Sequence, residues 1–284
     1  MSFFDRQLDY VLFAGGLVFL LISAVSLHLS RRNTGVSGGV LRWGYFSLFA
    51  LFQGVARWMT MGTIAYTPGP VYEYLSWSVM TLSFICLFES CRSTLGLLGE
   101  RWRLGRWVYL LLVTVSLVGA FWGISGLEVA VGCVFGLTGP LLAGAALIAA
   151  GNRLLPSVKV LKTIGWALVV YGVVVALATG SGPFVSSRLP PDLGRLLPSF
   201  SVLTELLQLV VGATVLVGLW RFRYRTIPGG MMGERNMWLQ IAMVVVVLVF
   251  LVGGWSLVEV VGNRAESEAQ SRLLEQANIV ALML

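Results

Sequence analysis

The feature that most constrains this chain is a series of apolar runs, each about 20 residues long, with very few charges inside them. An α-helix needs about 20 residues to cross the roughly 30 Å hydrocarbon core of a bilayer. Eight such runs are present, separated by short connections that often contain Gly or Pro. They extend approximately over residues 8–30, 40–62, 72–91, 105–123, 127–151, 160–181, 196–220 and 237–261. The sequence therefore predicts an all-α, polytopic helical membrane protein with about eight transmembrane helices.

Composition excludes the soluble classes. Only 12% of the 284 residues are charged and 57% are hydrophobic, whereas soluble domains carry about a quarter charged residues. The net charge of +7 is distributed in short basic clusters between the apolar runs. This pattern is typical of contact with a membrane surface, so we expect the lipid bilayer as partner and no nucleic acid. The three cysteines lie within apolar runs and predict neither a disulfide framework nor a metal cluster.

The chain lacks the residues that most membrane enzymes and cofactor proteins need. Its single histidine, His28, excludes bis-His haem and HExxH zinc chemistry. Both lysines, Lys159 and Lys162, lie at a predicted span boundary rather than in mid-span, where a retinal Schiff base forms. No P-loop, GxGxxG or kinase signature is present. We therefore predict that this chain is not an enzyme and holds no cofactor or metal.

The distribution of basic residues predicts the orientation of the spans. Fourteen Lys and Arg residues fall in the odd-numbered connections, five fall on the opposite side, and Arg57 lies inside a span. Because cytoplasmic loops carry the excess of Lys and Arg, both termini should face outward. Gly123-Ile124-Ser125-Gly126 is then predicted as an external turn between the fourth and fifth spans. Gly139-Pro140 is a candidate break within the fifth span.

The C-terminal residues predict a second, external part. We expect residues 1–262 to form the eight-helix membrane domain and residues 263–284 to begin an external, periplasmic helix of a longer protein. Apolar side chains recur along this segment at helical spacing, at Ala269, Leu273, Ala277, Val280 and Leu284. Such a stripe needs a partner, so a homodimer through this helix is one expectation. The alternative is a short helix lying on the outer leaflet.

Five polar residues within or beside the apolar runs form the candidate ligand-binding site. Gln53 and Arg57, four residues apart in the second span, share one helical face. Glu205 and Gln208, three apart in the seventh, also share a face. At about 1.5 Å per residue, Arg57 lies about 8 Å and Glu205 about 13 Å below the outer boundary. An Arg side chain spans this difference, so we predict an Arg57–Glu205 pair, with Glu73 nearby at the outer start of the third span.

Charged residues inside a span are costly and are typical of functional sites. The five residues therefore predict an outward-facing polar pocket for an unidentified ligand. The alternative interpretation is an interhelical ion pair that only fixes packing.

Two segments resemble a family of bacterial sensor proteins. FALFQGVARW at residues 49–58 is similar to the FGLLHGLNEW segment of their multi-span N-terminal regions. LSFICLFESCR at residues 82–92 is similar to the LSFLLLLEFGRR segment that follows it, and the tail from Arg264 resembles the first helix of a periplasmic Cache-like domain. The resemblance implies a multi-pass protein of the bacterial inner membrane, with a histidine kinase or diguanylate cyclase as output further along the chain.

The match departs from the family at its most polar positions. The family's His is Gln53 here, and its Asn-Glu pair is Ala56-Arg57, so no role of those residues carries over. The positions that match are Gly54, Trp58, Glu89 and Arg92, which we assign structural or anchoring roles. Glu89 and Arg92 are three residues apart at the inner end of the third span, where they predict a local ion pair near the headgroups.

Three functions are compatible with these features. The first is the membrane-embedded sensory input region of a bacterial signal-transduction receptor, such as a two-component system, which passes its signal through the eighth span. The second is a small-solute transporter or channel with a polar site between spans two and seven. The third is a scaffold without a ligand. Inverted repeats and broken helices, which are typical of transporters, are not evident in the sequence.

The predicted orientation has a direct test. Reporter fusions placed after Arg225 and after Arg272 should report opposite compartments, because the eighth apolar run lies between them and the basic residues place Arg225 inside. The measurement is alkaline phosphatase and fluorescent-protein activity of paired fusions. Reports from the same compartment contradict the span count or the orientation.

Overall fold

The computed structural model describes residues 3–32, 42–65, 70–99, 104–105, 107–153, 159–180 and 197–226. Within these residues all regular structure is helical, as the apolar runs predict. The elements are α1 (Phe3–Arg32), α2 (Trp43–Ala65), α3 (Pro70–Leu98), α4 (Trp107–Val118), the 3₁₀ helix η2 (Gly119–Trp122), α5 (Gly123–Arg153), α6 (Lys159–Gly180) and α9 (Leu197–Thr226).

Five of these helices, α1, α3, α5, α6 and α9, are long and apolar enough to cross a membrane. Two elements in predicted spans are not among the five: α2, which carries Gln53 and Arg57, and α4, which has only 12 residues. The eighth predicted span and the tail of residues 263–284 lie outside the described residues. The chain is thus a helical protein suited to a membrane, and the count of eight spans and the placement of both termini stay predictions.

Helix ends follow local chemistry. Pro70 occupies the first turn of α3, where proline's fixed φ suits a helix and its missing N–H costs nothing. At the other end of α3, Gly99 has φ of 139°, a backbone conformation that residues with a Cβ rarely adopt. This glycine therefore ends the helix at Leu98.

Two expectations about the middle of the chain are wrong. The predicted turn at residues 123–126 is helical, because α5 begins at Gly123. The tight connection between α4 and α5 is the 3₁₀ helix η2. A Cβ at Gly119 of η2 would lie 2.5 Å from the Gly126 carbonyl oxygen, so the close approach at this seam requires glycine at position 119. The candidate break at Gly139-Pro140 is also absent, since α5 runs through Pro140.

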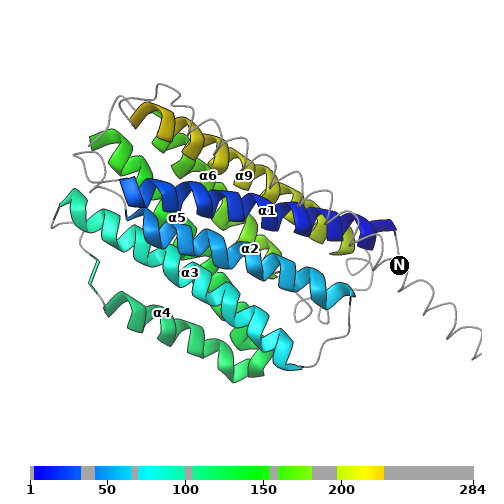
Figure 1. Ribbon diagram of the computed structural model, residues 1–284. Coiled ribbons are helices and arrows are strands. Elements are labelled where there is room, and N and C mark those ends of the chain that lie inside the picture. Colours follow the sequence, from blue (N-terminus) through cyan, green and yellow to red (C-terminus); the bar gives the residue numbers. More distant parts are fainter. Residues whose placement is uncertain are drawn as a thin grey trace, which may run out of the picture.

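Six helices contact one another in a closed ring, and Figure 1 shows the bundle from the side. In order around the ring, each contacts the next: α1, α2, α3, α5, α6 and α9, with α9 returning to α1. The helix α4 lies at the edge of the bundle against α5. It also reaches α3, where Tyr109 packs edge-to-face on Phe88 with ring centroids 5.0 Å apart. This arrangement leaves α2 and α9 separated by α1, with their side chains directed to a common interior.

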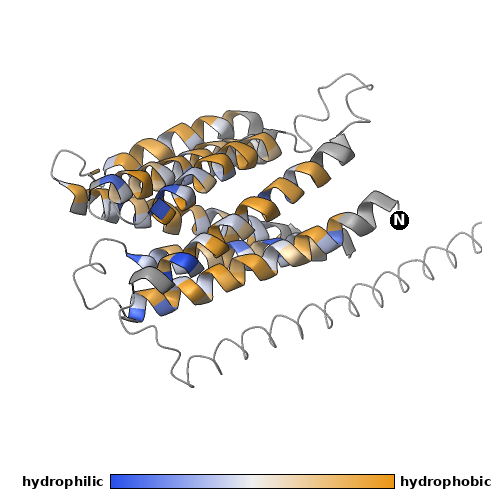
Figure 2. Cartoon of the chain, turned by 90° about the horizontal axis from the view of Figure 1, so that it is seen from above, coloured by the Kyte–Doolittle hydropathy of each residue, from blue (hydrophilic) through white to orange (hydrophobic). Residues whose placement is uncertain are grey.

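The interior of the six-helix ring is rich in aromatic side chains, while the outside is apolar. Phe49 of α2 lies 6.5 Å from Phe84 of α3 and 6.4 Å from Tyr171 of α6, measured between ring centroids. On the outside, apolar side chains such as Leu110 and Val210 are more than half exposed, and the helices are hydrophobic along most of their length (Figure 2). An exposed apolar surface of this extent suits lipid rather than water.

Small residues set the spacing between α5 and α6. A Cβ at Gly144 of α5 would lie 2.5 Å from the Gly165 carbonyl oxygen of α6, and one at Gly165 would lie 2.7 Å from the Gly144 carbonyl oxygen. The two backbones therefore touch at this crossing. Small residues at such crossings are typical of membrane helices, in which packing rather than water exclusion drives association.

This crossing predicts the effect of one substitution. Gly144→Leu should lower the free energy of unfolding by about 2–3 kcal/mol, because the new side chain forces the two backbones apart. The matched control is Ala145→Leu at the next position, which is exposed on the outer surface and should change stability little. Denaturation in mixed micelles measures both. Equal effects of the two substitutions contradict the packing assignment.

Candidate functional site

Polar side chains from four helices meet inside the six-helix ring. We call this group the Arg57 cluster; its members are Gln53 and Arg57 of α2, Ser83 of α3, Tyr171 of α6, and Glu205 and Gln208 of α9. All except Glu205 are at most 4% exposed. The cluster therefore forms a polar core within an otherwise apolar bundle.

Arg57 joins α2 to α9 at the centre of the cluster. One terminal nitrogen of its guanidinium donates to Oε2 of Glu205 and forms an ion pair with it, and the other donates to Oε1 of Gln208. Glu205 and Gln208 are three residues apart on α9, so both acceptors face α2 from the same side of that helix. The Arg57 side chain is 5% exposed and the Glu205 side chain 20% exposed. The acid is thus the more accessible member of the pair.

The helix α1 makes room for this contact. Arg57 extends past α1 to reach α9, and a Cβ at Gly15 would lie 3.1 Å from one of its terminal nitrogens. The guanidinium carbon also lies 5.1 Å from the centroid of the Phe19 ring of α1, a distance at which the aromatic face stabilises a cation. Within the described residues, Nε of Arg57 donates no hydrogen bond.

A second chain of hydrogen bonds extends the cluster to α3 and α6. Nε2 of Gln53 donates to the Tyr171 hydroxyl at 2.8 Å, and the Ser83 hydroxyl donates to Oε1 of Gln53 at 2.7 Å. The Tyr171 hydroxyl also interacts electrostatically with Arg57. Both ends of the Gln53 amide are therefore used, as a buried amide requires.

The residues next to Arg57 fix the approach of α1 to α2. A Cβ at Gly54 would lie 2.9 Å from the Gly16 carbonyl oxygen. Nε1 of Trp58 donates to the Phe13 carbonyl oxygen at 3.3 Å, and the two aromatic rings stack with centroids 5.9 Å apart. Gly54 and Trp58, two of the positions that match the sensor family, thus have packing roles here.

The other two matching positions form a separate site at the far end of α3. Nε and one terminal nitrogen of Arg92 donate to the two carboxylate oxygens of Glu89, at 2.8 and 2.6 Å. The Tyr109 hydroxyl of α4 donates to Oε2 of Glu89 at 2.6 Å. The ion pair is local, as its i, i+3 spacing predicts, and it additionally holds α4 against α3.

The structure brings together four of the five candidate ligand-binding residues. Gln53, Arg57, Glu205 and Gln208 all belong to the Arg57 cluster. The fifth, Glu73, lies in α3, and the structure does not describe its side chain. The four residues bind mainly to one another, so ligand binding by this cluster stays a prediction.

Sequence reasoning missed two members of the cluster. Tyr171 and Ser83 complete the hydrogen bonds of Gln53 but carry no charge that singles them out. A signal was present for Tyr171, because its hydroxyl lies in the middle of an apolar run, where it needs a partner. Ser83 gave no such signal, since hydroxyls in membrane helices commonly bond to their own backbone.

Comparisons with protein-family models, curated proteins and solved structures find no match for this chain. The assignment of function therefore depends on its own residues. Across the described part of the chain, no three His, Cys, Asp or Glu side chains lie together in a metal-binding arrangement.

A double-mutant cycle measures the strength of the Arg57–Glu205 pair. Arg57→Met and Glu205→Gln should each lower the free energy of unfolding by about 3 kcal/mol, because each leaves a buried polar partner uncompensated. The double variant should lose less than the sum, with a coupling energy of about 1–3 kcal/mol. Denaturation in mixed micelles supplies the three values.

The Glu89–Arg92 pair is the matched control for this cycle. Its side chains are 21% and 24% exposed, so a cycle of Glu89→Gln and Arg92→Met should give a coupling below about 1 kcal/mol. A coupling for Arg57–Glu205 no larger than this control contradicts the assignment of this buried ion pair as a strong link between α2 and α9.

Proposed function

We propose that this chain is the membrane-embedded sensory region of a bacterial signal-transduction receptor, multi-pass in the inner membrane. The observation that carries the proposal is the Arg57 cluster, in which one side chain of α2 holds two side chains of α9. In the sequence, α9 is followed by the eighth predicted span, residues 237–261. A change at the cluster therefore acts on the helix that leads toward the predicted external segment.

The physics of a buried ion pair supports a relay. Separating Arg57 from Glu205 leaves two charges in the membrane interior, which is costly, so the bundle favours discrete arrangements in which both charges are satisfied. A stimulus that offers either charge another partner shifts the balance between such arrangements. Small translations or rotations of one helix against its neighbours are a known way for receptors to transmit that shift.

Glu205 is the proposed contact point for a stimulus. Its side chain is four times as exposed as that of Arg57, which supports this role. A cation or proton that reaches the cluster then binds this carboxylate. In this proposal, neutralisation of Glu205 frees Arg57 and loosens α9.

A transporter or channel with its polar site between spans two and seven is the second candidate. The ion pair between α2 and α9 favours it, because intramembrane charge pairs occur on solute pathways. The continuity of α5 through Pro140 weighs against it, since transporter sites commonly contain broken helices. A scaffold in which the cluster only fixes packing is the third.

Distance measurements between spin labels test the relay. In a variant with Cys86, Cys91 and Cys133 replaced by alanine, labels at Leu82 of α3 and Leu206 of α9 occupy exposed positions. In nanodiscs, Glu205→Gln should add a second distance population, because α9 is no longer held by the charge of Arg57. Arg92→Met, which breaks the pair at the other end of α3, should leave the single population of the parent.

The distance measurement and a transport assay together distinguish the three candidate functions. Unchanged distances in a folded Glu205→Gln variant contradict the relay and favour a scaffold. Electrical currents from proteoliposomes on addition of amino acids or carboxylates, lost in Glu205→Gln, favour the transporter instead.

A further inference from the structure

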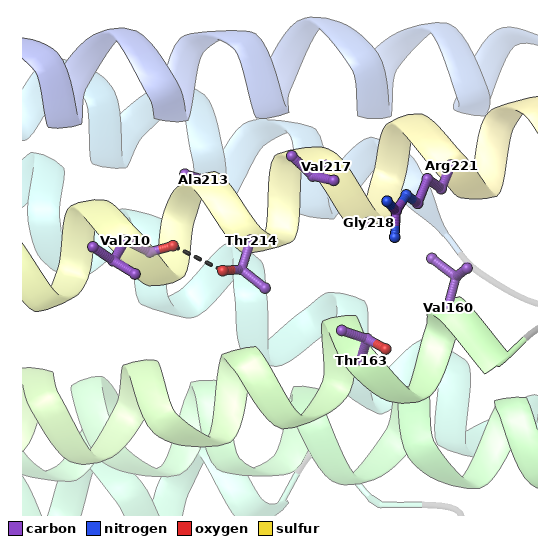
Figure 3. Close-up of a pocket in the computed structure, with 8 residues that line it drawn as sticks. All are labelled: Val160, Thr163, Val210, Ala213, Thr214, Val217, Gly218 and Arg221. Atoms are coloured by element: carbon purple, nitrogen blue, oxygen red, sulfur yellow. Dashed lines mark hydrogen bonds between the residues drawn. The ribbon is translucent and has the colours of Figure 1, made fainter.

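A groove of about 420 Å³ lies between α6 and α9, and none of the residues that line it belongs to the Arg57 cluster (Figure 3). Its walls are Val160 and Thr163 of α6 and Val210, Ala213, Thr214, Val217, Gly218 and Arg221 of α9. The lining residues of α9 extend over twelve positions, from Val210 to Arg221, which correspond to about 16 Å along a helix. This length is about half the thickness of a bilayer's hydrocarbon core and therefore matches one leaflet.

The walls of the groove are apolar apart from one end. The Thr214 hydroxyl donates to the Val210 carbonyl oxygen at 2.9 Å, so its polarity is satisfied within α9. Gly218 lies against α6, where a Cβ would be 2.6 Å from Cγ1 of Ile164, and this contact brings the two helices together. Val210 and Val217 are 61% and 52% exposed, and hydrocarbon is the environment that such side chains favour.

Arg221 closes the groove at its basic end. It is exposed, and its guanidinium extends from α9 toward α6, where Val160 lies opposite (Figure 3). Among the described residues no acid forms an ion pair with Arg221. The neighbouring Arg223 is engaged differently, because its guanidinium lies 5.7 Å from the centroid of the Trp220 ring. Arg221 is therefore a cation available to a ligand.

A second positive feature lies at the same end. Helix α6 begins at Lys159, one residue before Val160 of the groove, so the positive end of its dipole is next to the groove. The distribution of basic residues predicts that this end lies at the cytoplasmic surface. A phosphate at this end thus meets one guanidinium and one helix N-terminus, while an adjoining acyl chain meets mainly apolar walls.

We propose that the groove between α6 and α9 binds an anionic phospholipid of the inner leaflet. The phosphate of its headgroup binds Arg221 and the start of α6, and one acyl chain lies along Val217, Thr214 and Val210. The length of the groove, its apolar walls and the cation at its cytoplasmic end all match a phospholipid. This site does not depend on the function proposed for the Arg57 cluster.

Native mass spectrometry of the full chain tests the headgroup half of this site. The probes are dioleoyl phosphatidylglycerol and dioleoyl phosphatidylcholine, offered in equal amounts. The protein should retain the anionic lipid preferentially, and Arg221→Gln should reduce this preference about fivefold, as expected for one basic residue at a membrane surface. Arg221→Lys should keep most of it. Arg223→Gln is the matched control and should change the preference less than about twofold.

Filling the groove tests the acyl-chain half. Thr214→Phe should lower retention of both lipids, because the new ring occupies the space of the chain. Leu203→Phe, at an exposed position of α9 that does not line the groove, should leave retention unchanged. Thermal unfolding checks that every variant is folded.

A measurement on the unaltered chain tests the proposal without relying on the folding of any variant. Phosphatidylglycerol with a diazirine on its acyl chain should label residues 210–217 of α9 in preference to Leu110 and Phe121, which are also exposed. Even labelling of all exposed positions overturns the proposal, as do equal effects of Arg221→Gln and Arg223→Gln. A disulfide between Cys at position 214 and Cys within residues 237–261, or between two copies of the chain, shows a protein occupant and also overturns it.

Discussion

The structure depends on the neutralisation of one charge, the guanidinium of Arg57, inside a bundle suited to the membrane. A lone Arg at this depth is costly, and here the charge is met by Glu205, by the carbonyl of Gln208 and by the face of Phe19. These three partners come from two helices, and neither can shift along its axis without losing a contact. The charge therefore fixes the axial register of α1, α2 and α9 together.

The axial register of the helices and the spacing between them are set by different contacts in this bundle. Apolar side chains gain little by leaving lipid for the protein interior, so packing must come from close backbone contact and from polar bonds. Glycines supply the close contact, at Gly16 with Gly54 and at Gly144 with Gly165. These crossings set how near the helices lie, whereas the directional hydrogen bonds of the Arg57 cluster set which residues face each other. Close packing and polar bonding act together at Gly15, where the absence of a side chain lets Arg57 extend past α1.

The helices and the central ion pair could be predicted from sequence because both follow from simple constraints. Bilayer thickness dictates the length of the apolar runs, and a charge in mid-span demands an opposite charge at similar depth. Other features depend on tertiary contacts that no local pattern encodes. Whether residues 123–126 form a turn or a helix depends on how closely Gly119 approaches Gly126. Whether α5 continues through Pro140 depends on its packing against α3 and α6. Ser83 joins the cluster only because α3 and α2 happen to align it with Gln53.

Helix α9 is held toward its two ends by contacts of different kinds. Toward its N-terminal end, Glu205 and Gln208 are bound to Arg57 by an ion pair and a hydrogen bond, which are directional. Toward its C-terminal end, Phe222 packs on Trp43 of α2 with ring centroids 5.4 Å apart, a contact with less directional preference. Arg57 and Trp43 are fourteen residues apart on α2, as are Gln208 and Phe222 on α9, so the two contacts are separated by about 21 Å on both helices. An α-helix of this length is stiff, so the polar contacts near one end and the aromatic contact near the other act on the same rigid element. The directional polar contacts set which residues of α2 and α9 face each other, and the aromatic contact sets how the far parts of the two helices pack.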